Sequence, residues 1–208
     1  MKLDDFCVVL ASGSPRRIEM LKDDGLSPVI VKPDCGEDIH SDPDPRQLVM
    51  SLALRKGLAA EKKIFSRETL CGEIESGKPY VIISADTVVC KGNEVLGKPT
   101  DREDAKRMLL LLRGAVHQVC SGVFLNGRDE NGKRFKRLFF DVTDVFVRDF
   151  SDEWLEWYLH TDEPYDKAGA YAIQGLFGVS IDRIEGNYDN VVGLPYGKLK
   201  TVLSEMKL

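Results

Sequence analysis

The sequence predicts a mixed α/β fold of the α+β kind, in which two lobes share a cleft. Helical patterns alternate irregularly with strands and hairpins along the chain, which favours a mixed sheet over a regular doubly wound one. The 208 residues are enough to bury a sizeable core. A composition of 43% hydrophobic and 30% charged residues is typical of a soluble folded protein. Because no linker separates two parts, we expect residues 1–208 to form a single domain.

The first half of the chain shows elements with clear starts and stops. Ser14 can cap a helix whose first residue is Pro15, and Gly25 stops it. Thr100 and Glu103 form a capping box for a leucine-rich helix. The periodicity predicts, in order, a strand over 6–11, a helix over 15–24, a strand over 29–32, a helix over 45–63, a polar loop over 65–79, a strand over 80–90 and a helix over 100–113.

The second half is richer in strand patterns. A turn-rich stretch, 126–133, separates two of them and predicts a long hairpin. Pro195 is suited to open a helix at the C-terminus. The elements predicted here are strands over 117–125 and 135–147, a helix over 151–160, and short strands over 170–173, 179–184 and 188–192.

Charge and cysteine content narrow the class of protein. A net charge of −5 argues against a long polyanion such as duplex DNA as the main partner, although a small anion can still bind a local basic pocket. Two acidic residues precede the short apolar run at 6–11, which therefore does not resemble a signal peptide. We expect a cytoplasmic protein with no membrane or nucleic-acid partner. The thiols are odd in number and widely spaced, which fits reduced cysteines and no zinc ribbon: Cys7, Cys35, Cys71, Cys90 and Cys120.

Residues 10–17 read LASGSPRR, a strand followed by a tight turn and the start of a helix. The N-terminus of a helix already has a partial positive charge, so Arg16 and Arg17 in the first turn are unfavourable unless an anion lies there. A phosphate group would supply that anion. From the residues alone, the alternative that both arginines are solvated or paired with acids has about equal weight.

A carboxylate interrupts the strand pattern VIISADTVV at 81–89. A buried, unpaired carboxylate costs several kcal/mol, so Asp86 is expected to face a cleft that contains a metal ion, a cation or water. The alternative is a structural aspartate at the end of a strand, which fits less well because the apolar run continues beyond it. Asp86 is therefore a candidate functional residue.

An acidic loop at 34–38 and a lysine on the following helix are weaker signals. Glu37 in this loop and Asp86 could bind Mg²⁺ or Mn²⁺ through oxygen, with phosphates and waters completing the shell. An acidic loop is more often simply solvated, and a lysine such as Lys56 on an amphipathic helix usually faces water.

Two glycine–lysine segments, 72–78 and 92–98, resemble the start of a phosphate-binding loop. Each is followed by proline, which has neither the hydroxyl that binds Mg²⁺ nor an amide N–H. We therefore reject a P-loop and keep Lys98 as a candidate phosphate ligand. Serine-hydrolase and dinucleotide-binding patterns are absent from the sequence.

Several blocks of the sequence resemble the Maf family of nucleotide pyrophosphatases in their order and spacing. The resemblance covers nearly the whole chain, and ordered blocks are more specific than any single motif. It implies a two-lobed fold similar to that of Maf and inosine triphosphate pyrophosphatases, with a nucleotide cleft. It also implies cleavage of a nucleoside triphosphate between the α and β phosphates. The blocks are LASGSPRR at 10–17, SADTVV at 84–89, GKP at 97–99, DKAGAYAIQG at 166–175 and VVGLP at 191–195.

The resemblance also implies roles for individual residues. Asp86 matches the general base that activates water, Glu37 a helper in binding the divalent metal, and Lys56 a catalytic phosphate ligand. Ser12, Arg16, Arg17, Thr87, Lys98 and Gln174 make up the expected substrate-binding set. Residues Arg16, Thr87 and Gln174 mark the branch that prefers dTTP and UTP over 7-methyl-GTP. A homodimer would be ordinary for this family.

The sequence departs from the Maf family pattern in two places, and two other functions stay possible. The acidic loop is less dense than in many relatives, so the carboxylate that assists Asp86 stays open, and strand alternation puts Thr87 on the face opposite Asp86. The first rival is a nucleotide-binding regulator of cell division without turnover. The second is a pyrophosphatase for a purine nucleotide, against which Gln174 and Arg16 argue mildly.

Overall fold

A computed structural model describes residues 2–34, 44–66, 74 and 77–206. Its centre is one mixed sheet of seven strands in the order β2-β1-β3-β5-β6-β7, with β4 paired to β3. β1 is parallel to β2 and to β3, and the remaining pairs are antiparallel. The strands are β1 (Cys7–Leu10), β2 (Val29–Ile30), β3 (Tyr80–Lys91), β4 (Glu94–Leu96), β5 (Val116–Arg128), β6 (Arg134–Val147) and β7 (Ile181–Glu185).

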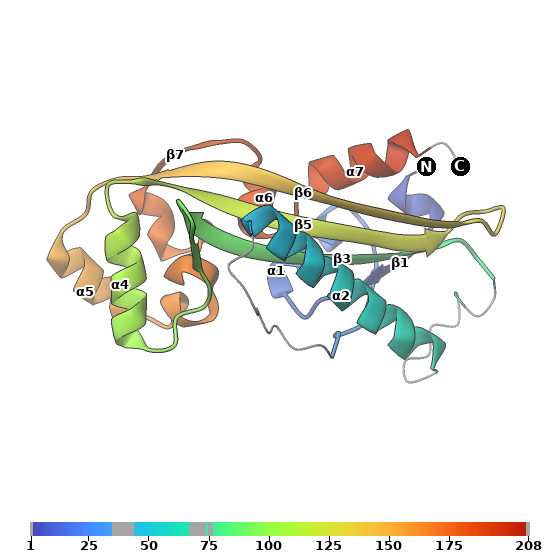
Figure 1. Ribbon diagram of the computed structural model, residues 1–208, viewed down its shortest axis with the longest axis horizontal. Coiled ribbons are helices and arrows are strands. Elements are labelled where there is room, and N and C mark those ends of the chain that lie inside the picture. Colours follow the sequence, from blue (N-terminus) through green and yellow to red (C-terminus); the bar gives the residue numbers. More distant parts are fainter. Residues whose placement is uncertain (1, 35–43, 67–73, 75–76, 207–208) are drawn as a thin grey trace.

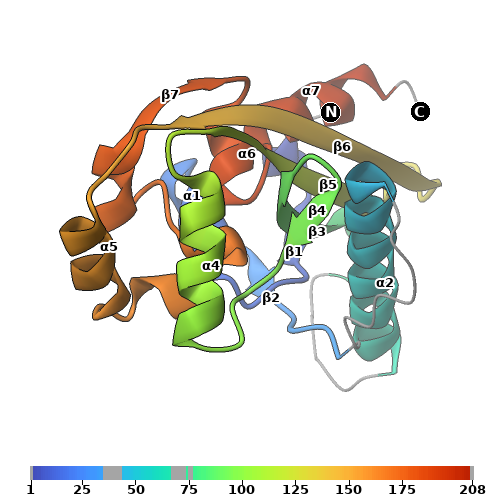
Figure 2. The ribbon, with the colours of Figure 1, turned by 60° about the vertical axis from the view of Figure 1, so that its left-hand side comes forward.

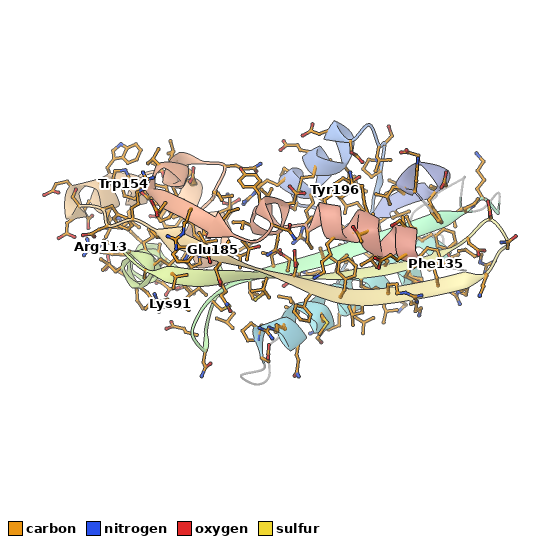
Figure 3. All side chains as sticks on the ribbon, turned by 90° about the horizontal axis from the view of Figure 1, so that it is seen from above. Lys91, Arg113, Phe135, Trp154, Glu185 and Tyr196 are labelled. Carbon is orange, nitrogen blue, oxygen red and sulfur yellow. The ribbon has the colours of Figure 1, made fainter. Side chains whose placement is uncertain are left out.

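Helices cover both faces of the sheet and one of its ends. The long strands β3, β5 and β6 run along the molecule, with α4 and α5 at one end (Figure 1). Seen from above, α7 and α2 lie on opposite faces of these strands (Figure 3). The helices are α1 (Pro15–Asp23), α2 (Pro45–Phe65), α4 (Arg102–Leu112), α5 (Asp152–Leu159), α6 (Tyr188–Val192) and α7 (Tyr196–Glu205). Short 3₁₀ turns lie at η1 (Leu3–Asp5), η2 (Glu163–Asp166), η3 (Ala168–Ala170) and η4 (Leu176–Ser180).

The buried apolar side chains form separate clusters along this sheet. At the end covered by α4 and α5, Leu109 and Leu155 pack with Val89 of β3. Further along, Leu21 of α1 and Leu199 of α7 pack on one face of β3 and β5. On the opposite face, α2 covers the strands. The predicted mixed α/β fold is confirmed, and β3 contributes to every cluster.

Most predicted boundaries are confirmed. Pro15 is the first residue of α1, Gly25 follows the end of that helix with φ +84°, and the Ser151 hydroxyl caps α5 by accepting from the amide of Trp154. No helix of the described ranges is both long and apolar enough to cross a membrane.

Two predicted caps differ from the structure. Asp101, not Thr100, caps α4, because its carboxylate accepts the amide of Asp104. Ser14 precedes α1, but its hydroxyl makes no capping bond within the described part of the chain.

Three predicted strands near the C-terminus also differ. Residues 188–192 form the helix α6, since their apolar side chains also fit helical spacing and a short run does not distinguish the two. Residues 170–173 are no strand, because Gly169 (φ 69°) and Ala170 (φ 61°) turn the backbone through the left-handed region. The strand predicted over 179–184 begins at Ile181, after η4.

Candidate active site

The turn between β1 and α1 is fixed by its own hydroxyl and by Arg17. Ser12 Oγ accepts a hydrogen bond from the Ser14 amide at 3.2 Å. Arg17 donates to the carbonyl oxygens of Gly193 and Ala85, each at 2.7 Å, and to Ser12 Oγ at 3.4 Å. The guanidinium therefore joins α1 to β3 and to the turn that precedes α7.

Thr87 lies on the same side of the sheet as Arg17, opposite to Asp86. Its Oγ1 accepts from Arg17 Nη2 at 3.0 Å and lies 2.8 Å from the Ser121 hydroxyl. Thr87 also donates to the carbonyl of Gly193 at 3.1 Å. In turn Ser121 donates to the carbonyl of Asn190. A polar network thus runs from α1 through two strands to α6, and it immobilises Thr87.

On the other face of β3, Asp86 forms an ion pair with Lys56 of α2. Both side chains are largely buried, with 12% of the Asp86 side chain and 14% of the Lys56 side chain exposed. The ammonium offsets the cost of burying the carboxylate, as expected for a charge inside a strand. Two residues that were predicted separately, Asp86 as the general base and Lys56 as a phosphate ligand, are therefore in direct contact.

Two glycines set the distance between α2 and the strands below it. Gly122 stands opposite Asp86 in the sheet, and a Cβ on it would lie 2.3 Å from the carbonyl oxygen of Val49. A Cβ on Gly57 would lie 2.5 Å from the ring of Phe124. Only glycine permits these approaches, which place Lys56 over Asp86.

A cavity of about 1280 Å³ opens beside this ion pair. Figure 2 shows α2 and α4 on the two sides of the β3–β4 hairpin, and residues of α2 and of this hairpin line the cavity. Its cationic lining comprises Arg16, Arg17, Lys56, Lys98 and Lys167. Its carboxylate lining comprises Glu19, Asp86, Glu94 and Asp166, and an apolar part includes Val89, Val119, Tyr171, Ile173, Val191 and Val192.

Asp166 and Lys167 are site residues to which the sequence reading gave no role. They form an ion pair with each other beside the cavity. Partial burial raises the pKa of Asp166, but Lys167 and Arg16 outweigh it and hold that pKa below its ordinary value. Arg16 and Asp166 are thus electrostatic neighbours across the cavity. Their separation in sequence hides this pairing, although both lie in blocks that resemble the family.

The sequence patterns also gave no role to Tyr171, whose hydroxyl is held by a buried histidine. The Tyr171 hydroxyl and His117 Nε2 are 2.7 Å apart. Burial, with a smaller effect of Lys91, lowers the pKa of His117 to about 3, so the imidazole is neutral at neutral pH. Tyr171 thereby presents a fixed ring to the apolar part of the cavity.

Not every predicted residue lies on the cavity. Gln174 is exposed, and within the described residues its neighbour Ile173, not Gln174 itself, lines the cavity. Ser12 contributes through Arg17 and not directly. Glu37 falls outside the described residues.

The donor set fits a divalent cation in part. The described residues contain no cluster of three or more histidine, cysteine or acidic side chains suited to a metal ion. Mg²⁺ commonly takes one or two protein carboxylates and completes its shell with phosphate oxygens and water, so Asp86 on the cavity wall satisfies the protein side of such a site.

The P-loop rejection holds for the second glycine–lysine segment. Residues 92–96 form the turn and returning strand of the β3–β4 hairpin, not a loop that enters a helix. Lys98 lies just past that strand, on the cavity wall.

Taken together, these groups define a mixed α/β protein whose cavity gathers cationic side chains around a buried carboxylate. The chain belongs to the Maf family, whose model, described as Maf-like protein, matches residues 7–206. The resemblance inferred from the sequence blocks is confirmed.

Curated relatives match over nearly their whole length. A dTTP/UTP pyrophosphatase of Agathobacter rectalis is 38% identical over 199 residues, which cover 96% of this chain and 97% of the relative. One from Acetivibrio thermocellus is 42% identical over 200 residues, with 95% and 94% covered. Among solved structures, a nucleoside-triphosphatase or dITP/XTP pyrophosphatase from Mycobacterium abscessus covers 67% of this chain and 72% of its own, at 15% identity and a TM-score of 0.29. That last similarity is too low to support a statement about this chain.

Proposed function

We propose that this chain hydrolyses dTTP and UTP to the nucleoside monophosphate and pyrophosphate. The family and the names of relatives at 38% and 42% identity support this activity. The observation that carries the proposal is the buried Lys56–Asp86 ion pair on the wall of a cavity that Arg16 and Lys98 also line. A triphosphate is a compact polyanion, and a cavity with several cationic groups matches its charge.

In the proposed reaction, Asp86 is the general base. Its carboxylate accepts a proton from a water molecule as the water oxygen forms a bond to the α phosphorus. The bond between the α phosphorus and the bridging oxygen breaks, and pyrophosphate leaves. Lys56 lies beside the carboxylate and can stabilise the charge that develops on the phosphoryl oxygens.

The remaining cations would orient the substrate. Arg16, Lys98 and Lys167 come from three separated segments, so together they can fix a phosphate chain in one direction. Arg17 acts indirectly, because its hydrogen bonds to the carbonyls of Gly193 and Ala85 hold the turn that carries Arg16.

A divalent cation, Mg²⁺ or Mn²⁺, completes the proposal. Asp86, with Glu37 as its predicted helper, would hold it. When bound, the cation supplies Lewis-acid polarisation of a phosphoryl oxygen and neutralises charge. Chelation is therefore expected to abolish turnover, and added Mg²⁺ or Mn²⁺ to restore it.

A product assay tests the proposal directly. The purified protein is incubated with dTTP, UTP, CTP, GTP, 7-methyl-GTP and inosine triphosphate in the presence of Mg²⁺ or Mn²⁺, and the products are identified by phosphorus NMR. Monophosphate and pyrophosphate from dTTP and UTP are expected. Stoichiometric diphosphate and orthophosphate, or nucleotide binding without turnover under both metals, would contradict the proposal. The second outcome would instead favour the regulator.

A cytoplasmic location and a homodimer remain expectations from the sequence. The second is checked by measuring the mass of the purified protein in solution.

A further inference from the structure

The backbone around Gln174 follows an irregular path. Residues 171–175 lie between η3 and η4 and belong to no helix or strand. The amide of Gly175 bonds back to the carbonyl of Ala172 at 3.2 Å, which gives a local turn. An irregular segment lacks the repeated hydrogen bonds of a sheet or helix, so side chains must fix its position. This matters because the segment carries both Ile173 on the cavity wall and Gln174, one of the residues that mark the branch preferring dTTP and UTP.

One carboxylate fixes the end of this segment. Glu163 Oε2 accepts from the amide of Leu176 at 2.8 Å, and Oε1 accepts from the amide of Phe177 at 3.1 Å. The hydroxyl of Tyr158, in α5, also donates to Oε1 at 2.9 Å. Hydrogen bonds to a carboxylate are roughly twice as strong as those between neutral groups. Glu163 thus ties the backbone just after Gln174 to η2 and α5.

The carboxylate lies directly against the next residue, Gly175. A Cβ on Gly175 would lie 2.2 Å from Glu163 Oε2 and 2.5 Å from Oε1. Any side chain there would displace the carboxylate from the amides that it accepts. The Glu163 carboxylate therefore occupies the space that a side chain at Gly175 would fill.

The start of the segment is fixed by a second buried contact. Tyr171 bonds to His117 on β5, and its ring packs against Phe177 with the ring centroids 4.9 Å apart. Two anchors, one before and one after, therefore bracket Ile173 and Gln174. Both anchors attach the segment to elements outside it, which are β5 on one side and η2 with α5 on the other.

We propose that Glu163 is a positioning residue for base selection, acting through the backbone amides of Leu176 and Phe177 to hold Gln174. This inference rests on the proposed hydrolysis of dTTP and UTP, and it adds that Gln174, which the family resemblance places in the substrate-binding set, reads uracil or thymine. Glu163 itself does not line the cavity within the described residues, so it touches neither the phosphates nor the reacting water. Loss of the Glu163 carboxylate should therefore change the selectivity between bases more than it changes the rate of hydrolysis.

The test compares kcat/KM for UTP with kcat/KM for CTP in the wild type, Glu163→Gln, Gln174→Ala and the double variant. Glu163→Gln keeps the shape of the side chain but places an NH₂ group against a backbone N–H, so the two amides are no longer both accepted. The UTP/CTP ratio is expected to fall about tenfold, because small displacements of a recognition group cost this much or more. In the Gln174→Ala background, Glu163→Gln should leave the ratio unchanged.

A loss of folded protein lowers turnover of both substrates equally, so the ratio separates positioning from stability. Gly175→Ala gives a second, independent variant that displaces the same carboxylate, and it decides the question if Glu163→Gln does not fold. Tyr158→Phe is the matched control. It removes one donor to Glu163 while leaving the two amide bonds, and it is expected to lower the melting temperature with the UTP/CTP ratio unchanged.

Failure of the inference and failure of the proposed function are distinguishable. A ratio that Gln174→Ala changes but that Glu163→Gln and Gly175→Ala leave at the wild-type value overturns the positioning role alone. A ratio that Gln174→Ala also leaves unchanged shows that Gln174 does not read the base. That result overturns the base-reading role of Gln174 and, with it, the positioning role of Glu163. A wild type without UTP turnover overturns the proposed function itself.

Discussion

Two adjacent arginines at the start of α1 have different environments. Both line the cavity, but Arg17 bonds the carbonyls of Ala85 and Gly193, whereas Arg16 lies near Asp166. The helix start would disfavour both charges without partners. The charge of Arg17 is offset by acceptors within the protein, so Arg16 is the stronger candidate of the pair for binding a phosphate.

Asp86→Asn is expected to leave the fold intact and to remove most of the activity. An amide cannot accept the proton of water and binds a cation poorly, while its shape is nearly that of the carboxylate. The loss of a general base typically costs about 10²- to 10⁴-fold in kcat. Turnover of UTP is measured beside the melting temperature. Near-normal turnover with an unchanged melting temperature would show that Asp86 is misassigned.

Gln174→Glu is expected to weaken cleavage of UTP and dTTP about tenfold or more. The glutamine amide offers an acceptor and a donor that complement N3–H and O4 of uracil, whereas a carboxylate repels O4. A mismatched pair of this kind costs roughly 1 to 3 kcal/mol. The values of kcat/KM for UTP, dTTP, CTP and GTP are compared in both proteins. An equal loss on all four substrates would mean that Gln174 supports the fold or the phosphates.

The sequence predicted those site residues whose chemistry conflicts with their local pattern. A carboxylate in the apolar strand marked Asp86, and paired arginines at a helix start marked Arg16. It could not reveal Glu163 or His117, because each is an ordinary residue in its own segment and acts only through a contact with a distant one. The family resemblance gave Lys56 and Asp86 separate roles, and their ion pair became apparent only in the structure.

At the scale of elements, two glycines allow α2 to lie close to the sheet. Its glycine at 57 and the strand glycine at 122 remove the atoms that would separate helix and sheet. The Ser84 hydroxyl then reaches the carbonyl of Ala53 at 2.8 Å and bonds α2 to β3. The Lys56–Asp86 contact is therefore a product of how closely two elements approach.

Gly57→Ala is expected to destabilise the protein and to lower kcat, although alanine favours helices. The added methyl would lie 2.5 Å from Phe124 and 2.6 Å from Ser84 Oγ, and overpacking of this kind costs about 1 to 3 kcal/mol. That cost exceeds the gain in helix propensity of about 1 kcal/mol. Melting temperature and UTP turnover measure the two effects.

Gly197→Ala, in α7, is the matched control for this change. Its Cβ would meet nothing within 4 Å, so the propensity gain should raise the melting temperature and leave turnover unchanged. If Gly57→Ala behaved like Gly197→Ala, the close approach of α2 would not be what places Lys56.

Elements with distinctive ends were predicted well, and those without them were not. Proline and glycine marked α1, and the helix predicted from residue 151 is α5, which Ser151 caps. The segment 188–192 has no such signal of its own. Its helix is stabilised instead by Asn190. The side-chain Nδ2 of Asn190 donates to the Val119 carbonyl on β5 at 2.9 Å and to Thr143 Oγ1 on β6 at 3.0 Å. Tertiary contacts of this kind override a short local pattern.

On the scale of the whole molecule, the charge is unevenly distributed. The chain carries a net charge of −5, yet its cavity gathers five cationic side chains against four carboxylates. The negative charge therefore lies mainly elsewhere on the molecule. A small anion can be held locally without making the protein attractive to long polyanions, as the composition suggested.

Binding of a UTP analogue with a methylene group in place of the α–β bridging oxygen should stabilise the whole fold. The residues of the cavity come from α1, α2, β3 and the segment after η2, so a ligand there contacts the native state only. At a concentration of about one hundred times Kd, the expected gain is roughly 2.7 kcal/mol. For a chain of this size the gain corresponds to a rise in melting temperature of about 5 to 10 °C. The same analogue of CTP serves as the control and should give a smaller rise. Equal rises for both would contradict base recognition in the cavity.

The continuity of β3 has one further consequence. This strand bears Asp86 and packs with the helices of both ends of the sheet, so the protein has no seam at which one end could be exchanged for that of a relative. A recombination event inside β3 or β5 would join half-strands from two different proteins, and the side chains packed on one half would not be complementary to those packed on the other. Exchanging one end of the sheet is therefore expected to disturb the core, whereas replacing single side chains on the cavity wall leaves the packing of β3 in place.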